Sequence, residues 1–342
     1  MNRTNELNRG GDLKIPKDYS ISLIRFISFV FIVSCHFLQF FGNELAWWFN
    51  VGVQMFLIIS GYLYGVKYFD KNIDCFLFYK TRLLKILLPY YIVLLSVLLI
   101  HVVFIHDISK VNILMALVCN KTIPGGEHLW YISTILMCYI LTPIIASLLC
   151  QSVRKRFFVV LVILFLSCYI FFGLFNQFYN PAWIACYILG FAFGVIEKRS
   201  FLSQKVIICI VFILSLQNIL QVLNNYVFNL VDRNNSMYQS WSDCNHIWLG
   251  ALIFLLVKIL LSDKSIFNKR VFIKILDFSD KYSYEGYLVH QFMILGPLSL
   301  IGLTNHYVLD IAVIVCLILL LSFIVKVIEN IFLKILNHRR VK

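Results

Sequence analysis

Two ionisable residues lie inside the first long apolar run of the sequence, residues 20–41. Arg25 and His36 are separated by eleven positions, which in a helix corresponds to about 16 Å of rise and about 20° of rotation. They therefore share one helix face with other polar residues spaced three and four apart. Because ionisable groups inside a membrane are costly, they usually mark a functional site. The structural alternative is that Arg25 reaches the cytoplasmic interface while His36 bonds a neighbouring helix.

Two further apolar runs contain polar or aromatic candidates. Ser60 lies in the glycine-rich stretch GVQMFLIISGYLYG, where a small residue serves either close helix packing or a site. His128 and Trp130 open the run EHLWYISTILMCYILTP. A tryptophan at this position is also typical of an anchor at the membrane interface.

A later segment, SYEGYLVH, places another histidine on a polar helix face. Ser283, Tyr287 and His290 follow one another at spacings of four and three and share that face. Glu285 lies about 140° from His290 around the helix, so the carboxylate is not an obvious partner for this histidine. His290 equally suits a site or a hydrogen bond to a neighbouring helix.

The composition is that of a membrane protein. Of 342 residues 61% are hydrophobic and 14% are charged, and the mean hydropathy is +0.84. Apolar runs of about twenty residues predict an all-α polytopic protein rather than a β-barrel. We expect a single domain over residues 1–342, with a polar cytoplasmic segment at 1–19 that contains no cleavable signal peptide. About ten membrane-spanning helices are predicted at 20–41, 50–66, 86–106, 127–149, 157–175, 181–196, 205–226, 246–262, 283–302 and 307–331.

Every second loop between the predicted spans is rich in Lys and Arg, so the basic residues collect on one side of the membrane. Twenty-six of the thirty Lys and Arg residues fall on one side, three fall on the other, and Arg25 lies within the first span. The positive-inside rule then makes both termini cytoplasmic. The net charge of +13 thus reflects topology, and we expect no nucleic-acid partner. No cysteine spacing typical of a metal site is present, so no metal is expected.

One basic stretch, residues 67–85, also carries apolar residues. We expect it to lie as a loop on the inner membrane surface. Its residues Arg82 and Lys85 are candidates for binding an anion, although basic residues there are expected from topology alone.

Taken together, these segments resemble the acyltransferase-3 family of integral-membrane O-acyltransferases, which includes bacterial enzymes that acetylate surface polysaccharides. The resemblance covers residues 18–330. It rests on six elements in the family's order: Arg25 to His36, GVxxFxxxSGYL at 52–63, the group Arg82, Lys85, Pro89 and Tyr90, HLWY at 128–131, the pair Gly190 and Gly194, and SYxxYLVH at 283–290. Gln54, Ile135 and Leu136 stand where the family often has acidic residues. A carboxylate that orients His36 is therefore not identified from the sequence.

The resemblance implies transfer of an acetyl or other short acyl group from cytosolic acyl-CoA to a hydroxyl of a cell-surface saccharide or lipid-linked sugar. It implies a multi-pass protein of the bacterial plasma membrane, with acetyl-CoA as a substrate and no bound cofactor. His36 would act as the general base and Arg25 would hold a phosphate or pantetheine oxygen. Arg82 and Lys85 would bind the nucleotide phosphates. The substrate-binding candidates are Ser60, His128, Trp130, Tyr287 and His290.

Two other classes of function fit parts of the sequence. A secondary transporter of a saccharide or lipid-linked intermediate would also need an intramembrane arginine and histidine, but no internal repeat typical of transporters is present. A sensor or scaffold is the third class, for which the sequence offers no soluble receptor-like domain.

Overall fold

The structure is a computed structural model that describes residues 17–105, 108–120, 122–174, 180–260 and 270–338. Within these residues the regular elements are helices and no strand is present, so the all-α prediction is confirmed. Of the polar segment predicted at 1–19, only residues 17–19 belong to the described part. The predicted inner-side basic residues Lys264 and Lys269 and the predicted outer-side residue Lys121 lie outside it.

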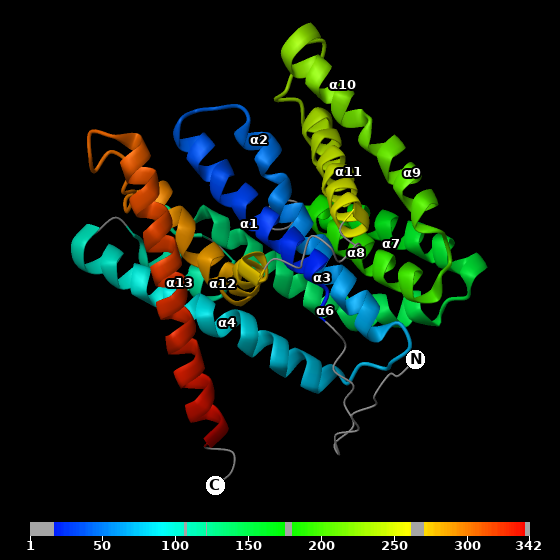
Figure 1. Ribbon diagram of the computed structural model, residues 1–342, viewed down its shortest axis with the longest axis horizontal. Helices are drawn as coiled ribbons and strands as arrows, with labels where there is room; N and C mark the ends of the chain where they lie inside the picture. The colour runs from blue at the N-terminus through cyan, green and yellow to red at the C-terminus, as the bar shows by residue number, and fades with distance from the viewer. Residues whose placement is uncertain (1–16, 106–107, 121, 175–179, 261–269, 339–342) are drawn as a thin grey trace.

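The helices differ widely in length. The α-helices are α1 (Tyr19–Phe40), α2 (Ala46–Phe49), α3 (Val51–Tyr68), α4 (Cys75–Ile100), α5 (Lys110–Leu117), α6 (Trp130–Gln151), α7 (Arg154–Leu174), α8 (Pro181–Arg199), α9 (Gln204–Ser215), α10 (Gln217–Leu223), α11 (Ser236–Leu260), α12 (Arg270–Ile294) and α13 (Tyr307–His338) (Figure 1). The short turns are η1 (His101–Ile105), η2 (Glu127–Leu129) and η3 (Asn224–Phe228).

Eight of the helical segments in the described part of the chain are long and apolar enough to cross a membrane. They coincide with eight of the ten predicted spans, so a multi-pass membrane protein is confirmed. Over the remaining two predicted spans, the apolar part of α7 is shorter, and α12 carries charged residues throughout its first half. The number ten remains a prediction.

Several predicted boundaries are wrong, and hydrogen bonding explains one of them. Helices α11 and α12 begin at Ser236 and Arg270, ahead of the starts predicted at 246 and 283. The basic stretch 67–85 is not a loop, because α4 already begins at Cys75, where the Asp74 side chain accepts a hydrogen bond from the Leu77 backbone N–H at 3.0 Å. Arg82 and Lys85 therefore lie within α4. The span predicted at 283–302 ends as a helix at Ile294, since the following segment turns at two glycines with positive φ, Gly296 and Gly302.

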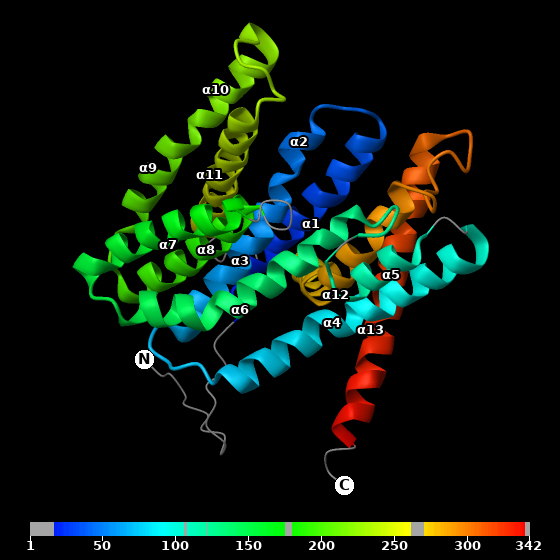
Figure 2. The same cartoon turned by 180° about the vertical axis from the view of Figure 1, so that it is seen from behind.

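The centre of the molecule is built from α1, α3, α8 and α12. Helix α1 packs against α3 and α12, and α12 packs in turn against α13. Helices α9 and α10 run beside α11 at one side of the molecule (Figures 1 and 2). The consequence for the site is that α1 and α12, far apart in sequence, contribute neighbouring side chains.

Helices α3 and α8 approach each other backbone to backbone. A Cβ atom on Gly61 would clash with the Tyr187 carbonyl oxygen, and one on Gly190 would clash with the Ile58 carbonyl oxygen. Glycine is therefore required at both positions, and the interface has the small-residue character typical of packed membrane helices. This interface fixes the position of α3 and therefore of Ser60, which lies on that helix.

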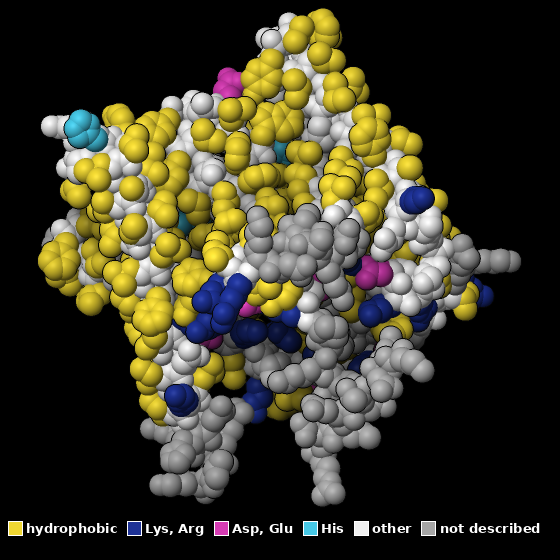
Figure 3. Space-filling model, viewed as in Figure 1, with side chains coloured by type: hydrophobic (Ala, Val, Ile, Leu, Met, Phe, Trp, Pro, Cys, Tyr) yellow, Lys and Arg dark blue, Asp and Glu magenta, His cyan; other side chains and the backbone are white. Residues whose placement is uncertain are grey.

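The basic side chains gather at one end of the molecule. On the face shown in Figure 3, most Lys and Arg side chains lie in the lower half, where α13 ends, while hydrophobic side chains cover much of the rest. This separation matches the polarity that the positive-inside rule requires.

This polarity leads to a topological prediction. In a variant without native cysteines, single cysteines placed at Asn43 and Arg233 should react with a membrane-impermeant maleimide on intact cells. A cysteine at Lys71 should react only after permeabilisation, because it lies at the basic end. Labelling at Lys71 in intact cells would overturn the predicted orientation.

Candidate functional site

Two cavities share Tyr287 as a lining residue. The first, which we call the histidine cavity, has a volume of about 680 Å³. Its walls come mainly from α1, α2, η2 and α12. Its polar and aromatic lining residues include His36, Gln39, Glu127, His128, Trp130, Trp183, Tyr287 and Gln291. It thus contains four of the predicted site residues.

Three histidines from three elements lie close together, and two of them, His36 and His128, line this cavity. The ring centroids of His36 and His290 are 5.0 Å apart, those of His128 and His290 are 4.9 Å apart, and those of His36 and His128 are 6.5 Å apart. His128 and His290 are buried, whereas His36 is partly exposed to the cavity. Among the described residues no three His, Cys, Asp or Glu side chains are arranged to hold a metal ion. His36 is the histidine that a substrate can reach.

The partner of each histidine indicates where its proton lies. His290 Nδ1 is 2.6 Å from the Tyr287 carbonyl oxygen, and His128 Nε2 is 3.1 Å from the Leu288 carbonyl oxygen. A carbonyl oxygen only accepts, so each of these nitrogens donates its N–H. The other ring nitrogens, His290 Nε2 and His128 Nδ1, have no partner among the described residues. Both buried rings are therefore held by the backbone of α12.

His36 is oriented by an amide rather than by a carboxylate. Its Nδ1 lies 2.7 Å from the Gln39 Oε1 atom, which accepts the Nδ1–H hydrogen bond. This leaves Nε2 of the neutral ring with a lone pair that can accept a proton. Gln39 is on the polar face predicted from the sequence, but its role there was not predicted, because a hydrogen-bond partner one turn away depends on the side-chain conformation.

A second pair of residues links η2 to α12. Gln291 Nε2 donates to Glu127 Oε2 at 2.6 Å, and Gln291 Oε1 accepts from the His128 backbone N–H at 2.9 Å. Tyr287 also donates its hydroxyl to the His128 carbonyl oxygen at 2.5 Å. These bonds join segments about 160 residues apart and fix His128 beside His290. Sequence reasoning missed Glu127 and Gln291, whose only signal is their position beside predicted site residues.

Trp130 belongs to a stacked pair of aromatic rings. Its ring stacks on that of Trp183 with centroids 3.6 Å apart and an interplanar angle of 16°. Both rings line the histidine cavity. They give it a flat aromatic wall.

The second cavity, which we call the basic cavity, has a volume of about 470 Å³. Its lining has six cationic side chains and two carboxylates. The cations are Arg25, Lys67, Arg82, Lys85, Lys281 and Lys326, and the carboxylates are Asp280 and Glu285. Ser60 lies here and not with His128. The guanidinium of Arg82 stands over the Tyr64 ring at 5.2 Å. The excess of positive charge makes this cavity suited to an anion.

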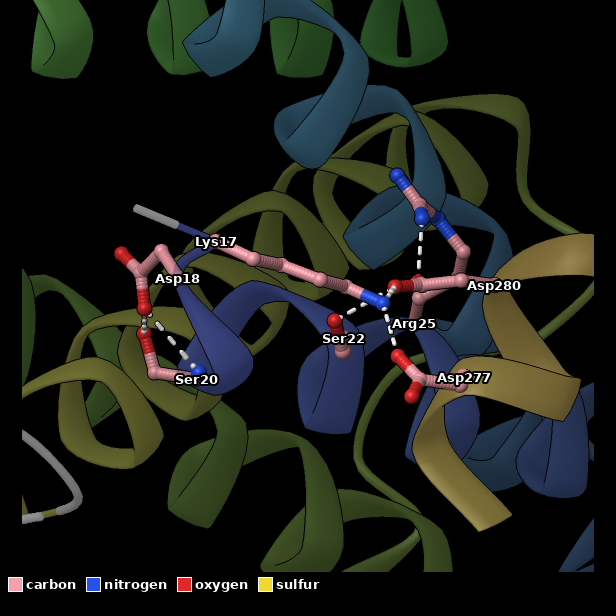
Figure 4. A network of polar contacts seen from close by, with 7 residues as sticks. All are labelled: Lys17, Asp18, Ser20, Ser22, Arg25, Asp277 and Asp280. Carbon is pink, nitrogen blue, oxygen red and sulfur yellow. Dashed lines mark hydrogen bonds and ion pairs between the residues drawn. The ribbon is translucent and has the colours of Figure 1, made fainter. Parts of the chain in front are cut away.

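Arg25 is held by a carboxylate that sequence reasoning did not identify. It forms an ion pair with Asp280, which also accepts from the Ser22 hydroxyl at 2.5 Å and lies 2.7 Å from Lys17 Nζ. Figure 4 shows these side chains converging from α1 and α12. Asp280 precedes Ser283, Tyr287 and His290 at helical spacing, and this was the available signal.

Lys17, just before α1, completes this network through Asp277 at 2.5 Å. Burial opposes its charge, but the two carboxylates outweigh that effect and hold the pKa of Lys17 above its usual value. The beginning of α1 is therefore tied to α12 by charge. This fixes Arg25 at the wall of the basic cavity.

Glu285 points away from His290, as its helical position predicts. Its carboxylate pairs with Lys326 of α13 at 2.8 Å, and Lys326 also pairs with Glu329 at 2.8 Å. Arg25 and His36 share the polar face of α1 but open into different cavities. Tyr287 lines both.

The comparison with protein families agrees with this geometry. A family model described as "Acyltransferase domain", that of the acyltransferase-3 family, matches residues 18–327. No curated protein and no solved structure matches the chain significantly. The matched range contains every residue that lines the two cavities. The chain belongs to the acyltransferase-3 family and is a multi-pass membrane acyltransferase.

Proposed function

We propose that the protein transfers an acetyl or other short acyl group from cytosolic acyl-CoA to a hydroxyl of a cell-surface saccharide or lipid-linked sugar. The observation that carries this proposal is that Tyr287 lines both cavities. A basic cavity on one side of this residue suits a phosphorylated acyl donor. A cavity with amides, histidines and stacked tryptophans on the other side suits a polyhydroxylated acceptor.

The acyl donor would lie in the basic cavity. Arg82 and Lys85 would contact the nucleotide phosphates, and Arg25 would hold a phosphate or pantetheine oxygen farther in. Asp280 keeps one edge of the Arg25 guanidinium occupied. Because the guanidinium carries five N–H groups, an edge remains for the acyl donor.

The transfer itself needs one general base. The Nε2 atom of His36 would take the proton of the acceptor hydroxyl, and the hydroxyl oxygen would form a bond with the acyl carbon. The carbon–sulfur bond then breaks, CoA leaves as the thiolate, and the proton on His36 can pass to the sulfur. Gln39 holds the ring in the tautomer that this step requires.

The acyltransferase family favours this function over the secondary transporter considered from the sequence. The proposal places the protein in a bacterial plasma membrane with both termini in the cytoplasm. Mass spectrometry of surface glycans from cells with and without the gene tests it. Loss of one acyl mass from one sugar is expected, and identical glycan masses would contradict the proposal.

The role proposed for Arg25 gives a binding prediction. Arg25→Ala should weaken binding of a non-hydrolysable acetyl-CoA analogue by about 10- to 100-fold, since a charge-assisted hydrogen bond contributes about 1.5–3 kcal/mol. Arg25→Lys should restore only part of the affinity because the planar fork is lost. Isothermal titration calorimetry on the purified protein in detergent measures this.

The control for this experiment is Arg156→Ala, which removes an exposed arginine outside both cavities. It should leave the affinity unchanged. If both Arg25 variants bind the analogue as the unaltered protein does, the acyl donor is held elsewhere, and Arg82 and Lys85 become the residues to test.

A further inference from the structure

A third cavity adjoins the histidine cavity. It has a volume of about 430 Å³, and we call it the lateral cavity. Glu44 and Trp47 line both it and the histidine cavity. Its other walls come from α10, η3, the loop that follows η3, and α11. The mechanism proposed above uses none of the residues that belong to the lateral cavity alone.

Two lining residues of the lateral cavity, Gln221 and Ser242, belong to a buried polar network with Asn245. Gln221 Nε2 donates to Ser242 Oγ at 2.5 Å, and Asn245 Nδ2 donates to Gln221 Oε1 at 2.9 Å. All three side chains are buried, whereas Ile219 and Leu220 on the same helix are more than half exposed. Polar groups inside a membrane bundle are costly and usually serve a function.

The rim of the lateral cavity comes from an irregular part of the chain. Helix α10 continues into the π-helical turn η3, and such turns occur frequently at functional sites because they redirect side chains. Tyr226 on this turn lies under the Arg233 guanidinium at 5.7 Å. Arg233 also pairs with Glu44 at 3.3 Å, which joins the rim to the loop before α2.

The chemistry of these walls matches a sugar ring better than a phosphate or an acyl chain. Amide and hydroxyl side chains both donate and accept, as sugar hydroxyls do. The rings of Trp47 and Tyr226 offer apolar faces with a polar edge. A phosphate would need more cations than Arg233, which Glu44 already neutralises. An acyl chain would place apolar groups against the charged side chains of Glu44 and Arg233.

We infer that the lateral cavity binds a second, uncharged sugar residue of the acceptor, next to the residue that is acylated in the histidine cavity. The acceptor is then an oligosaccharide or polysaccharide, and the enzyme recognises at least two consecutive residues. This inference rests on the proposed function. It assigns a recognition role to α10, η3 and the beginning of α11.

The test uses acceptors of graded length. Polysaccharide extracted from cells that lack the gene is partly hydrolysed and fractionated into monosaccharides and oligosaccharides, and transfer from radiolabelled acetyl-CoA to each fraction is measured. Tyr226→Ala and Gln239→Ala alter exposed wall residues, whereas Phe228→Ala and Met237→Ala alter exposed residues nearby that do not line the cavity. These two serve as matched controls.

The unaltered protein should show a higher kcat/KM for the oligosaccharides than for the monosaccharides. Tyr226→Ala and Gln239→Ala should lower kcat/KM about three- to ten-fold for oligosaccharides alone, mainly through KM. Equal rates for all lengths, or wall variants no different from the controls, would overturn the inference while leaving the proposed function intact. Transfer to no fraction would contradict the proposed function, and the inference would fall with it.

Discussion

Substituting His36 by glutamine is expected to lower acyl transfer by about 10²- to 10⁴-fold without loss of folded protein. A general base contributes about this much to the rate, and glutamine has no basic nitrogen. Glutamine can still donate and accept hydrogen bonds, so it would preserve a purely structural role between helices. His36→Ala should be equally inactive. The measurement is the initial rate of CoA release by purified protein with acetyl-CoA and unacylated polysaccharide.

Two other histidines serve as comparisons. His306→Gln changes an exposed residue outside both cavities and should retain the full rate. His290→Gln should retain measurable turnover, because His290 is buried and its Nδ1–H is bonded to the backbone. A well-folded His36→Gln variant with a near-normal rate would refute the assignment and direct attention to His290 or His128.

The second large effect concerns the interface of α3 and α8. Gly190→Ala should destabilise the protein by about 1–3 kcal/mol, and Gly190→Leu by more, because the new side chain overlaps the backbone of α3 at Ile58. Both helices must then separate, which displaces Ser60 from the basic cavity. Thermal unfolding of the protein in detergent, followed by size-exclusion chromatography, measures the change.

Gly250→Ala is the matched control for this prediction. A Cβ at Gly250 would approach Gln54 Cβ at 3.1 Å and would meet only side-chain atoms, which can adjust. Its cost should be small, since alanine also favours the helix by about 1 kcal/mol over glycine. Equal stability of Gly190→Ala and the unaltered protein would contradict the backbone-to-backbone packing.

Local periodicity predicted the parts of the site that lie on single helices. The spacing of Arg25 and His36 predicts that they share one face of one helix. In the structure Arg25 lines the basic cavity and His36 lines the histidine cavity. Tyr287 and His290 were likewise placed together. Such predictions succeed because helix geometry fixes the relation of residues within one element.

The pairings between helices could not be predicted from one sequence. Asp280 lies 255 positions from Arg25, and Trp183 stacks on Trp130 across two helices. Which helices are neighbours depends on packing, for which sequence periodicity gives only the buried face. The charge pattern around Arg82 and Lys85 predicts a loop at the membrane surface, whereas the Asp74 cap starts α4 before them.

Transfer across a sealed membrane tests the central claim most directly. Radiolabelled acetyl-CoA is enclosed in proteoliposomes, and unacylated polysaccharide is added outside. Protein molecules whose basic cavity faces outward are inactivated with a membrane-impermeant reagent, so that only those with the basic cavity inward contribute. We expect label on the external polysaccharide from the unaltered protein and none from His36→Gln. Label that appears only when both substrates are on the same side would contradict a path from the basic cavity past Tyr287 to the histidine cavity.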